Sequence, residues 1–123
     1  MISFERFLLE GGVPIYLQIL LYIKRGIVAG TICHGEELPS RRVLSALLGV
    51  NPNTVQKAYR MLEEEGLIAS HAGAKSYVVL DDQTVTRIRR ELLAEDARSI
   101  VSAMRQMAIS KEEALALIEE YWD

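Results

Sequence analysis

The stretch from Pro39 to Gly66 limits the folds open to this sequence more than any other part of it. Asn51 is a favourable helix N-cap, because its side-chain oxygen can accept a hydrogen bond from a first-turn backbone N–H. Pro52 suits the first helical position, since the N–H that it lacks would have no partner there. Apolar residues then recur at helical spacing until Gly66, a typical C-terminal stop. This pattern predicts a capped helix that begins at Pro52.

The residues just before this helix predict a second, shorter helix. Ser40 can cap it, Arg41 follows, and its apolar positions end at Gly49. Two short helices joined by a tight turn with a glycine form a helix-turn-helix. In that motif the second helix lies in the DNA major groove with its N-terminal residues toward the base edges. The candidate base-facing residues are Asn53, Thr54, Gln56 and Lys57.

The composition excludes several protein classes. The chain has 123 residues, 50% of them hydrophobic, which suffices for one core and a small appendage but not for two full domains. Its single cysteine, Cys33, cannot form an intramolecular disulfide, as expected in a reducing cytosol. No apolar run is long enough for a membrane span, and the first residues lack the layout of a signal peptide. We therefore expect a cytoplasmic protein without membrane contact.

Net charge alone argues against DNA binding, because the whole chain carries −3. However, residues 1–80 contain eight Lys/Arg and seven Asp/Glu, a sum of +1, whereas residues 81–123 contain six and ten, a sum of −4. Phosphate binding depends on local cations. The candidate cations for the DNA face are Arg41, Arg42, Lys57, Arg60 and Lys75. The acidic run Glu63-Glu64-Glu65 at the far end of the predicted recognition helix indicates modest affinity for non-specific DNA.

The remaining elements follow from hydrophobic periodicity and turn residues. Before the helix-turn-helix we expect an arm or short strand over 1–12, a helix over 14–29, and a loop or short strand over 31–37. After it we expect strands over 67–70 and 76–80 around a turn at 72–74. A helix over 83–108, capped by Asp81 and Asp82, should follow, and the capping box Ser110-x-x-Glu113 should open a last helix. The predicted fold is mostly α with a small β wing. A winged helix-turn-helix domain occupies residues 1–80, and a two-helix dimerisation tail occupies residues 81–123.

The tail predicts the oligomeric state. Two helices in about forty residues cannot enclose their own apolar faces, and the longer helix has apolar residues on more than one stripe. The same helices of a second subunit, related by a two-fold axis, would bury these faces. The predicted interface residues are Val85, Ile88, Leu92, Leu93, Ile100, Val101, Met104, Leu115 and Ile118. The alternative is that the tail folds back on its own winged helix.

Several runs of this sequence resemble the DNA-binding domain of GntR-type bacterial transcription regulators. They are Pro14-Ile15-Tyr16-x-Gln18-Ile19, Leu38-Pro39-Ser40-x-Arg42-x-Leu44, Leu48-Gly49-Val50-Asn51-Pro52-Asn53-Thr54-Val55 and Ala58-Tyr59-x-x-Leu62-Glu63-x-Glu65-Gly66-Leu67-Ile68. The match covers roughly residues 13–80 in one register, and the short tail resembles the YtrA-like branch. The resemblance implies a homodimer that binds double-stranded DNA. Most such regulators carry a larger effector domain in place of this tail, so a small-molecule effector would bind at the dimer or domain interface.

The resemblance also assigns candidate DNA contacts. Arg42 stands at the Pro-Ser-x-Arg position whose arginine meets DNA, although it could instead form a surface ion pair with Glu36 or Glu37. The expected phosphate contacts are Ser40, Lys57 and Arg60, with Arg41 as an additional cation.

The predicted recognition helix carries the expected base contacts. Asn53, Thr54 and Gln56 match the contact positions, with Asn51 beside them, and Gln56 could pair bidentately with adenine. A solvated helix surface is the alternative. Some branches have arginines at the positions of Pro52 and Gln56, so strong guanine readout is not expected. Tyr59 is expected in the core with its hydroxyl near the surface.

The predicted wing departs from the family pattern. Family wings read Arg-Arg-Gly-x-Gly, whereas this chain has His71-Ala72-Gly73-Ala74-Lys75. Gly73 could let the backbone approach the minor groove, with Lys75 as the local cation, but the loss of both arginines predicts weak wing anchoring. Cys33, His34 and His71 lack the spacing of metal ligands. We therefore expect no metal and no other cofactor.

These observations favour one function over two others. We expect a sequence-specific transcription regulator, a repressor, that binds a palindromic operator as a dimer, with a transporter operon as its target because similar regulators often lie beside ABC transporter genes. An enzyme would need a nucleophile–base pair, paired catalytic carboxylates or a phosphate loop, and the sequence supports none of them. A winged helix that binds protein instead of DNA would present an apolar patch where this chain has polar residues.

Overall fold

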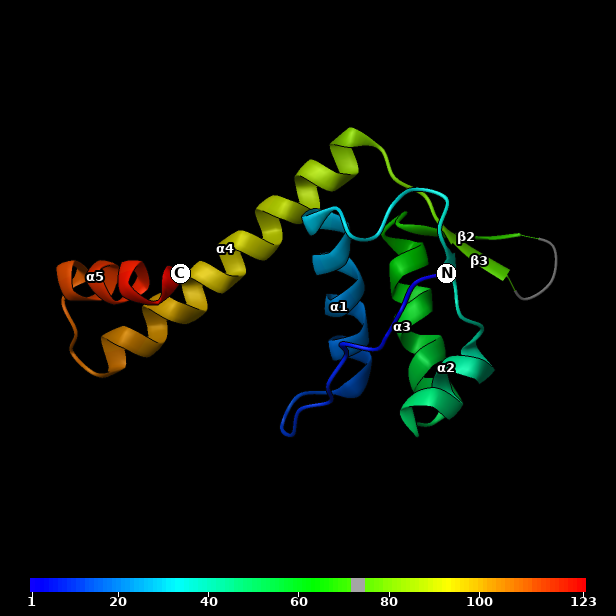
Figure 1. Cartoon of the computed structure of the whole chain (residues 1–123), viewed down its shortest axis with the longest axis horizontal. Helices are drawn as coiled ribbons and strands as arrows, with labels where there is room; N and C mark the ends of the chain where they lie inside the picture. The colour runs from blue at the N-terminus through cyan, green and yellow to red at the C-terminus, as the bar shows by residue number, and fades with distance from the viewer. Residues whose placement is uncertain (72–74) are drawn as a thin grey trace. The chain divides into compact units, whose positions relative to one another are not determined.

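The computed structural model describes residues 1–71 and 75–123. In these residues the elements follow the order α1 (Ile15–Ala29), β1 (Glu37–Leu38), α2 (Arg41–Leu48), α3 (Pro52–Glu64), β2 (Ile68–His71), β3 (Lys75–Val78), α4 (Asp82–Gln106) and α5 (Lys111–Trp122) (Figure 1). The fold is mostly helical with one small sheet, as predicted. The chain divides into two compact units, Met1–Ile88 and Arg89–Asp123. None of the described helices is both long and apolar enough to cross a membrane.

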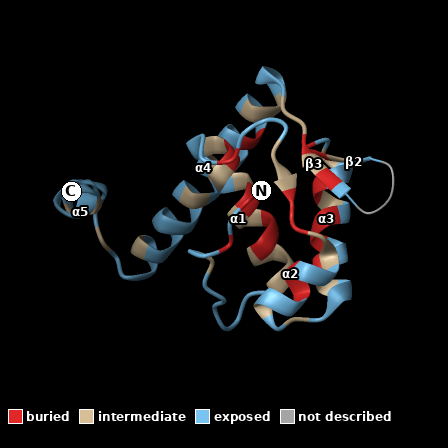
Figure 2. Cartoon of the chain, turned by 45° about the vertical axis from the view of Figure 1, so that its right-hand side comes forward, coloured by how far each residue is buried: buried red, intermediate tan, exposed pale blue. Residues whose placement is uncertain are grey.

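The first unit has its apolar core between the inner faces of α1, α2 and α3, where the buried residues gather in Figure 2. Ile19 of α1, Leu44 of α2 and Leu62 of α3 are all 0% exposed. Ile88 of α4 is equally buried in this core, and Val85 packs against it. The first unit therefore extends past residue 80 and ends at Ile88, because the first turns of α4 complete its core.

The helix-turn-helix consists of α2 and α3, as predicted. Gly49 ends α2 with φ 68°, a left-handed conformation that glycine adopts without a steric penalty. The Val50 N–H then donates to the Ser45 carbonyl oxygen at 3.0 Å, which closes the turn. After α3, Gly66 adopts φ 77° and begins the connection to β2.

The sheet has the order β1-β3-β2 with antiparallel pairing throughout the described strands. Val78 pairs with Ile68 of β2, and Tyr77 pairs with Glu37 of β1. The hairpin of β2 and β3 matches the predicted wing. The region predicted as a loop or short strand is a loop followed by the two-residue strand Glu37–Leu38.

The N-terminal arm packs on the first unit. The Ile2 N–H donates to the Glu37 carbonyl oxygen at 2.9 Å, and Ile2 and Phe4 are only 6% and 5% exposed. The Phe4 and Tyr22 ring centroids lie 5.0 Å apart. Gln18 holds the turn before α1, because its side chain bonds to the backbone of Glu10 at 2.8 Å and 2.9 Å. Residues 1–12 are thus an arm that contributes to the core, without a strand of their own.

The tail helices begin at capped residues. The Asp81 carboxylate accepts the Thr84 N–H at 2.8 Å, and the Ser110 hydroxyl accepts the Glu113 N–H at 3.2 Å. The long helix ends at Gln106 and not at the predicted residue 108, because Ala108 adopts a left-handed φ of 56°. This conformation lets the N–H groups of residues 108 and 109 bond to carbonyls of the last helical turn, at 3.0 Å and 3.2 Å.

Candidate nucleic-acid interface

The N-terminus of α2 is capped by Ser40. The Ser40 Oγ accepts the Val43 N–H at 3.1 Å, which leaves its O–H as a free donor. Arg42 is exposed and has no ion-pair partner among the described residues, so the alternative pairing with Glu36 or Glu37 does not form. A helix N-terminus with a free cation beside it favours an anion such as phosphate.

Arg41 is half-buried and packs against α3. Its Cζ lies 5.1 Å from the centroid of the Tyr59 ring, which is a cation–π contact. The Arg41 Nε is buried and has no hydrogen-bond partner among the described residues. The sequence identified Arg41 as a cation of this face, but nothing in its spacing indicated this contact.

Tyr59 fixes the start of α2 against α3. Its side chain is 0% exposed, and its hydroxyl donates to the Pro39 carbonyl oxygen at 2.7 Å. Burial raises the pKa of the Tyr59 phenol well above its usual range, and the positive charge of Arg41 opposes this rise. Tyr59 therefore lies in the core as expected, but its hydroxyl is buried and bonded, not near the surface. The bond to the residue before Ser40 sets where the α2 N-terminus lies.

The N-terminal half of α3 presents a polar row. The Asn51 side-chain oxygen accepts the Asn53 N–H at 2.8 Å, as expected of an N-cap, so only the amide NH₂ of Asn51 remains free. Asn53 and Gln56 are exposed and Thr54 is half-buried, while Val55 on the inner side is 0% exposed. The predicted base contacts thus lie on the solvent-facing side of a capped helix. This arrangement matches what a recognition helix presents to the major groove.

The two cations of α3 have different partners. The Lys57 Nζ lies 3.9 Å from the centroid of the Tyr16 ring, which belongs to the first turn of α1. The Arg60 Nε lies 3.9 Å from Glu64, one turn further along the same helix, and both side chains are largely exposed. Exposed ion pairs of this kind are weak, so Arg60 remains available to a phosphate. The sequence did not predict the contact between Tyr16 and Lys57, because these two residues are far apart in the chain.

The wing contributes described residues at its two strand ends. Lys75 is exposed at the start of β3, opposite His71 at the end of β2. The His71 ring centroid lies 5.4 Å from that of Tyr77. Gly73, the predicted site of minor-groove approach, lies outside the described residues. Lys75 is therefore the exposed cation that the described strands of the wing provide.

The acidic end of α3 is partly neutralised. Glu63 and Glu64 are exposed, but the Glu65 carboxylate lies 2.8 Å from the Lys24 Nζ and 3.8 Å from Arg87. The Lys24 side chain is only 12% exposed, so solvent screens this pair less than a surface pair. The acidic run therefore repels DNA less than its three carboxylates suggest.

The structure separates the predicted interface residues of the tail into two groups. Ile88 is 0% exposed within the core of its own chain, so it offers no surface to a second subunit, and the half-buried Val85 packs against that core. The other members are exposed or half-buried; they are Leu92, Leu93, Ile100, Val101, Met104, Leu115 and Ile118. Assigning Ile88 to the interface was therefore wrong, because the first turns of α4 belong to the first unit. The exposed aromatics Tyr121 and Trp122 were not among the predicted residues.

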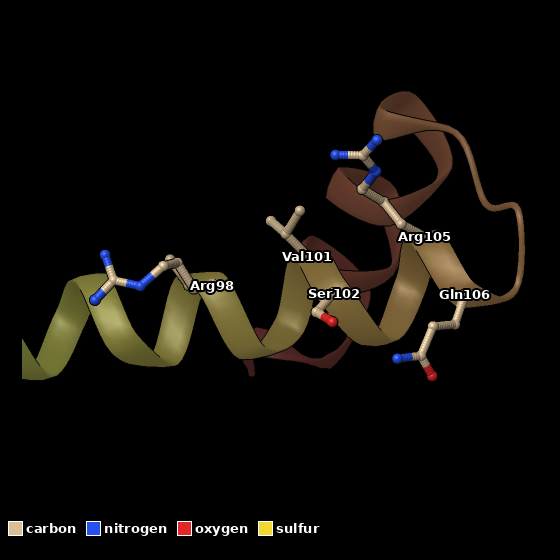
Figure 3. A pocket seen from close by; sticks show the side chains of 6 residues that line it. Arg98, Val101, Ser102, Arg105 and Gln106 are labelled. Atoms are coloured by element: carbon tan, nitrogen blue, oxygen red, sulfur yellow. The ribbon is translucent and has the colours of Figure 1, made fainter.

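One side of α4 in the second unit combines an apolar residue with two cations. Figure 3 shows the side chains of Arg98, Val101 and Arg105 projecting from the same side of the helix, and Ser102 and Gln106 line the same pocket. Arg98 is paired with Glu95 at 3.1 Å. A surface that covers Val101 would therefore also meet the Arg105 guanidinium and the Arg98–Glu95 ion pair.

The described residues contain no group of three or more His, Cys, Asp or Glu that could hold a metal ion. His34 uses its Nδ1 to accept the Leu80 N–H at 3.0 Å, so this nitrogen is occupied. The chemistry that the described face offers is therefore hydrogen bonding and charge, from two helix N-termini and the cations beside them.

Comparison with known proteins identifies this arrangement. The family model described as bacterial regulatory proteins, gntR family, matches residues 15–78. The HTH-type transcriptional repressor YtrA of Bacillus subtilis (strain 168) is 31% identical over 108 residues, which cover 87% of this chain and 83% of that protein.

Solved structures agree with this match. A GntR family transcriptional regulator from Listeria monocytogenes superposes with a TM-score of 0.79 at 33% identity and covers 91% of this chain and 98% of that one. The AraR DNA-binding domain, solved in complex with an operator, matches with a TM-score of 0.52 at 28% identity and covers 58% of this chain and 93% of that one. The proteins of this family are transcription regulators, not enzymes. The chain therefore belongs to the GntR family of bacterial regulatory proteins, as a YtrA-like, DNA-binding transcription regulator.

Proposed function

We propose that this protein is a cytoplasmic repressor that binds a palindromic operator as a homodimer. The observation that carries the proposal is the polar row Asn53, Thr54 and Gln56 on the outer side of a capped α3, beside the capped N-terminus of α2. Both N-termini suit phosphate, and the row between them suits base edges. The proposed phosphate contacts are Ser40, Arg41, Arg42, Lys57, Arg60 and Lys75, and Asn51 lies beside the proposed base contacts.

Homodimer formation through the tail is the second part of the proposal. Leu93, Val101 and Leu115 are 51%, 52% and 55% exposed, which is unusual for large aliphatic residues at helical spacing. Burying them against a second copy would remove this apolar surface from water. A two-fold dimer would place two recognition helices on half-sites separated by about one or two helical turns, so the operator would be a palindrome.

We infer repression, and the target genes, from the resemblance to YtrA-like regulators. The YtrA relative is a repressor by its name, which supports repression here. We propose an operon for a membrane transporter as the target, because YtrA-like regulators often lie beside such genes. A small-molecule effector would bind at the dimer or domain interface.

Selection of bound genomic fragments tests this function. The purified chain is incubated with sheared DNA of its source organism, and the bound fragments are sequenced and used as probes in gel shifts, together with the promoter of its own gene. We expect one palindromic sequence to be enriched and bound about 10³-fold or more tightly than scrambled duplex at the same salt concentration. Equal affinity for enriched and scrambled duplexes would contradict the proposal and favour the protein-binding winged helix.

A further inference from the structure

Tyrosine rings, and not carboxylates, hold two of the cations on the proposed DNA face. The Lys57 Nζ lies 3.9 Å from the Tyr16 ring centroid, and the Arg41 Cζ lies 5.1 Å from the Tyr59 ring centroid. Each pair joins two elements: Tyr16 comes from α1 and Lys57 from α3, whereas Tyr59 comes from α3 and Arg41 from α2. Neither cation has an ion-pair partner among the described residues.

Two other cations of the first unit have carboxylate partners instead. Lys24 is paired with Glu65 at 2.8 Å, and Arg60 lies 3.9 Å from Glu64. A carboxylate neutralises the cation and accepts its N–H groups. An aromatic ring attracts the cation through its quadrupole, so the charge and the N–H donors remain available to another acceptor. The ring-held cations therefore keep their full charge and donors for an anion, whereas Arg60 must first give up a weak, exposed ion pair.

We propose that Tyr16 and Tyr59 are positioning residues of the DNA interface. Each holds a long cationic side chain over its ring at the edge of the recognition helix, so that the ammonium of Lys57 and the guanidinium of Arg41 meet DNA phosphates already ordered. This proposal rests on the proposed function, since it names what prepares the phosphate contacts of the same face.

The hydrogen bonding of Arg41 supports this assignment. Its Nε is buried without a partner among the described residues, which is unfavourable in the free protein. A small shift of the guanidinium toward a phosphate oxygen would give this N–H an acceptor while the ring contact is kept. Tyr59 itself cannot move with Arg41, because its hydroxyl is bonded to Pro39 at 2.7 Å. The ring is therefore a fixed support.

The expected gain is entropic. A free lysine or arginine side chain loses rotamer freedom when it is immobilised on binding, and holding it beforehand lowers that loss. The free energy involved for one side chain corresponds to roughly a two- to tenfold change in affinity. The phosphate contact itself contributes about 0.9 to the slope of log K against log salt.

A double-mutant cycle on the Tyr16–Lys57 pair tests the proposal. The intact chain and the variants Tyr16→Leu, Lys57→Gln and the double variant are titrated with the same selected duplex over a range of salt concentrations. We expect Tyr16→Leu to weaken binding roughly two- to tenfold in the wild-type background and to have no effect in the Lys57→Gln background. Tyr16→Phe keeps the ring and should restore wild-type binding.

The Arg41–Tyr59 pair provides a second arm. Arg41→Gln should lower the salt slope by about 0.9, because the guanidinium held over the Tyr59 ring would no longer be there to meet a phosphate. A measurement without DNA accompanies both arms. In the free protein, the Lys57 methylene protons over the Tyr16 ring should resonate upfield, and Tyr16→Leu should remove that shift.

The outcomes separate this inference from the proposed function. Equal losses from Tyr16→Leu in both backgrounds, or no loss in either, would overturn the positioning role of Tyr16 while the protein still binds its operator. A salt slope that Arg41→Gln leaves unchanged would overturn the phosphate contact of Arg41 and with it the role of the Tyr59 ring that holds this side chain. If the wild-type chain distinguishes no duplex from scrambled DNA, the proposed function itself fails and this inference fails with it.

Discussion

At the scale of single residues, the proposed interface depends on side chains that each make a local backbone bond and still have a group free for DNA. Ser40 and Asn51 cap their helices through oxygen and keep an O–H or N–H donor free. Tyr59 has no such free group, because its hydroxyl is fully used by Pro39. Tyr59 therefore contributes to the proposed interface by fixing the start of α2 against α3, and its hydrogen bond should contribute to the free energy of unfolding.

Replacing Tyr59 with Phe should destabilise the protein by about 1–3 kcal/mol, because the buried Pro39 carbonyl loses its hydrogen bond. Urea unfolding measures the change. Tyr22→Phe is the matched control: it removes a 2.8 Å hydroxyl bond to the carbonyl of Ser3, which is exposed and can bond to water instead. Equal losses in the two variants would show that burial of the Pro39 carbonyl does not matter.

Gln56 and Lys57 should affect DNA binding in different ways. Gln56→Ala should cost about 1–3 kcal/mol on the selected operator and relax the preference at one base position. Lys57→Ala should weaken all duplexes alike and lower the salt slope by about one unit. Titrations of operator and scrambled duplex at several salt concentrations separate the two effects. If Gln56→Ala lowers operator and scrambled binding equally, α3 does not read bases.

At the scale of elements, the sequence predicted the helices of the first unit because their ends carry strong local signals. Asn51, Pro52 and Gly66 fix α3, and the core-facing positions Val55 and Leu62 follow directly from its period. The sequence contains no comparable local signal for contacts between helices. The Lys57–Tyr16 contact could not be predicted, because no local pattern brings α1 and α3 together at those residues.

The end of α4 is a second feature that the sequence did not predict. Ala108 continues the apolar and helix-forming pattern, so the sequence predicted a helix up to that position. Its φ of 56° instead closes a C-terminal cap in which the Ile109 N–H bonds to the Met104 carbonyl oxygen at 3.2 Å. The hydrogen bonds of the cap thus outweigh the helix propensity of Ala108.

Ala108→Gly should therefore stabilise the protein by about 0.5–1 kcal/mol, because glycine adopts a left-handed φ without the steric penalty that alanine has there. Ala103→Gly in the interior of the same helix should destabilise it by about 1 kcal/mol. Thermal unfolding of both variants compares one substitution at two backbone conformations. The same sign of change at both positions would contradict the cap.

Asp81 should make the start of α4 sensitive to pH. Its bonds from the Thr84 backbone lower the pKa of its carboxyl in the folded state. Its stabilising effect is then complete above the unfolded-state pKa and is lost as the pH falls through the lower folded-state pKa. Asn also caps helices but does not titrate.

The stability advantage of the wild type over Asp81→Asn should therefore shrink between about pH 6 and about pH 3. Urea unfolding at the two pH values measures the advantage, and subtraction removes the carboxylates that both proteins share. An advantage that is the same at both pH values, or that grows in acid, would contradict the capping role.

At the scale of the whole molecule, the first unit is a complete winged helix only when the first turns of α4 are included. Ile88 looks like a member of an interface stripe in the sequence, because periodicity tells which residues share a helix face but not what covers that face. The exposed apolar residues from Leu93 onward remain without a cover among the described residues. They are the basis of the proposed dimer.

The variant carrying Leu93→Asp and Ile100→Asp should be monomeric, since a two-fold interface would bury unpaired charges at both positions. Its affinity for the operator should fall by roughly 10²–10⁴-fold, because a single half-site loses the effective concentration of a linked pair. Leu8→Asp is the control, as Leu8 is 81% exposed on the N-terminal arm. If the double variant remains dimeric, the dimer interface must lie on another surface of the protein.

The stoichiometry of the complex tests the central claim most directly. Sedimentation equilibrium of the selected operator duplex with an excess of the intact 13.8 kDa chain gives the number of chains on each duplex. We predict two chains per duplex, with no stable complex of one chain. Tight binding of one chain to one duplex, by a protein that is monomeric at micromolar concentration, would contradict the dimeric regulator proposed here.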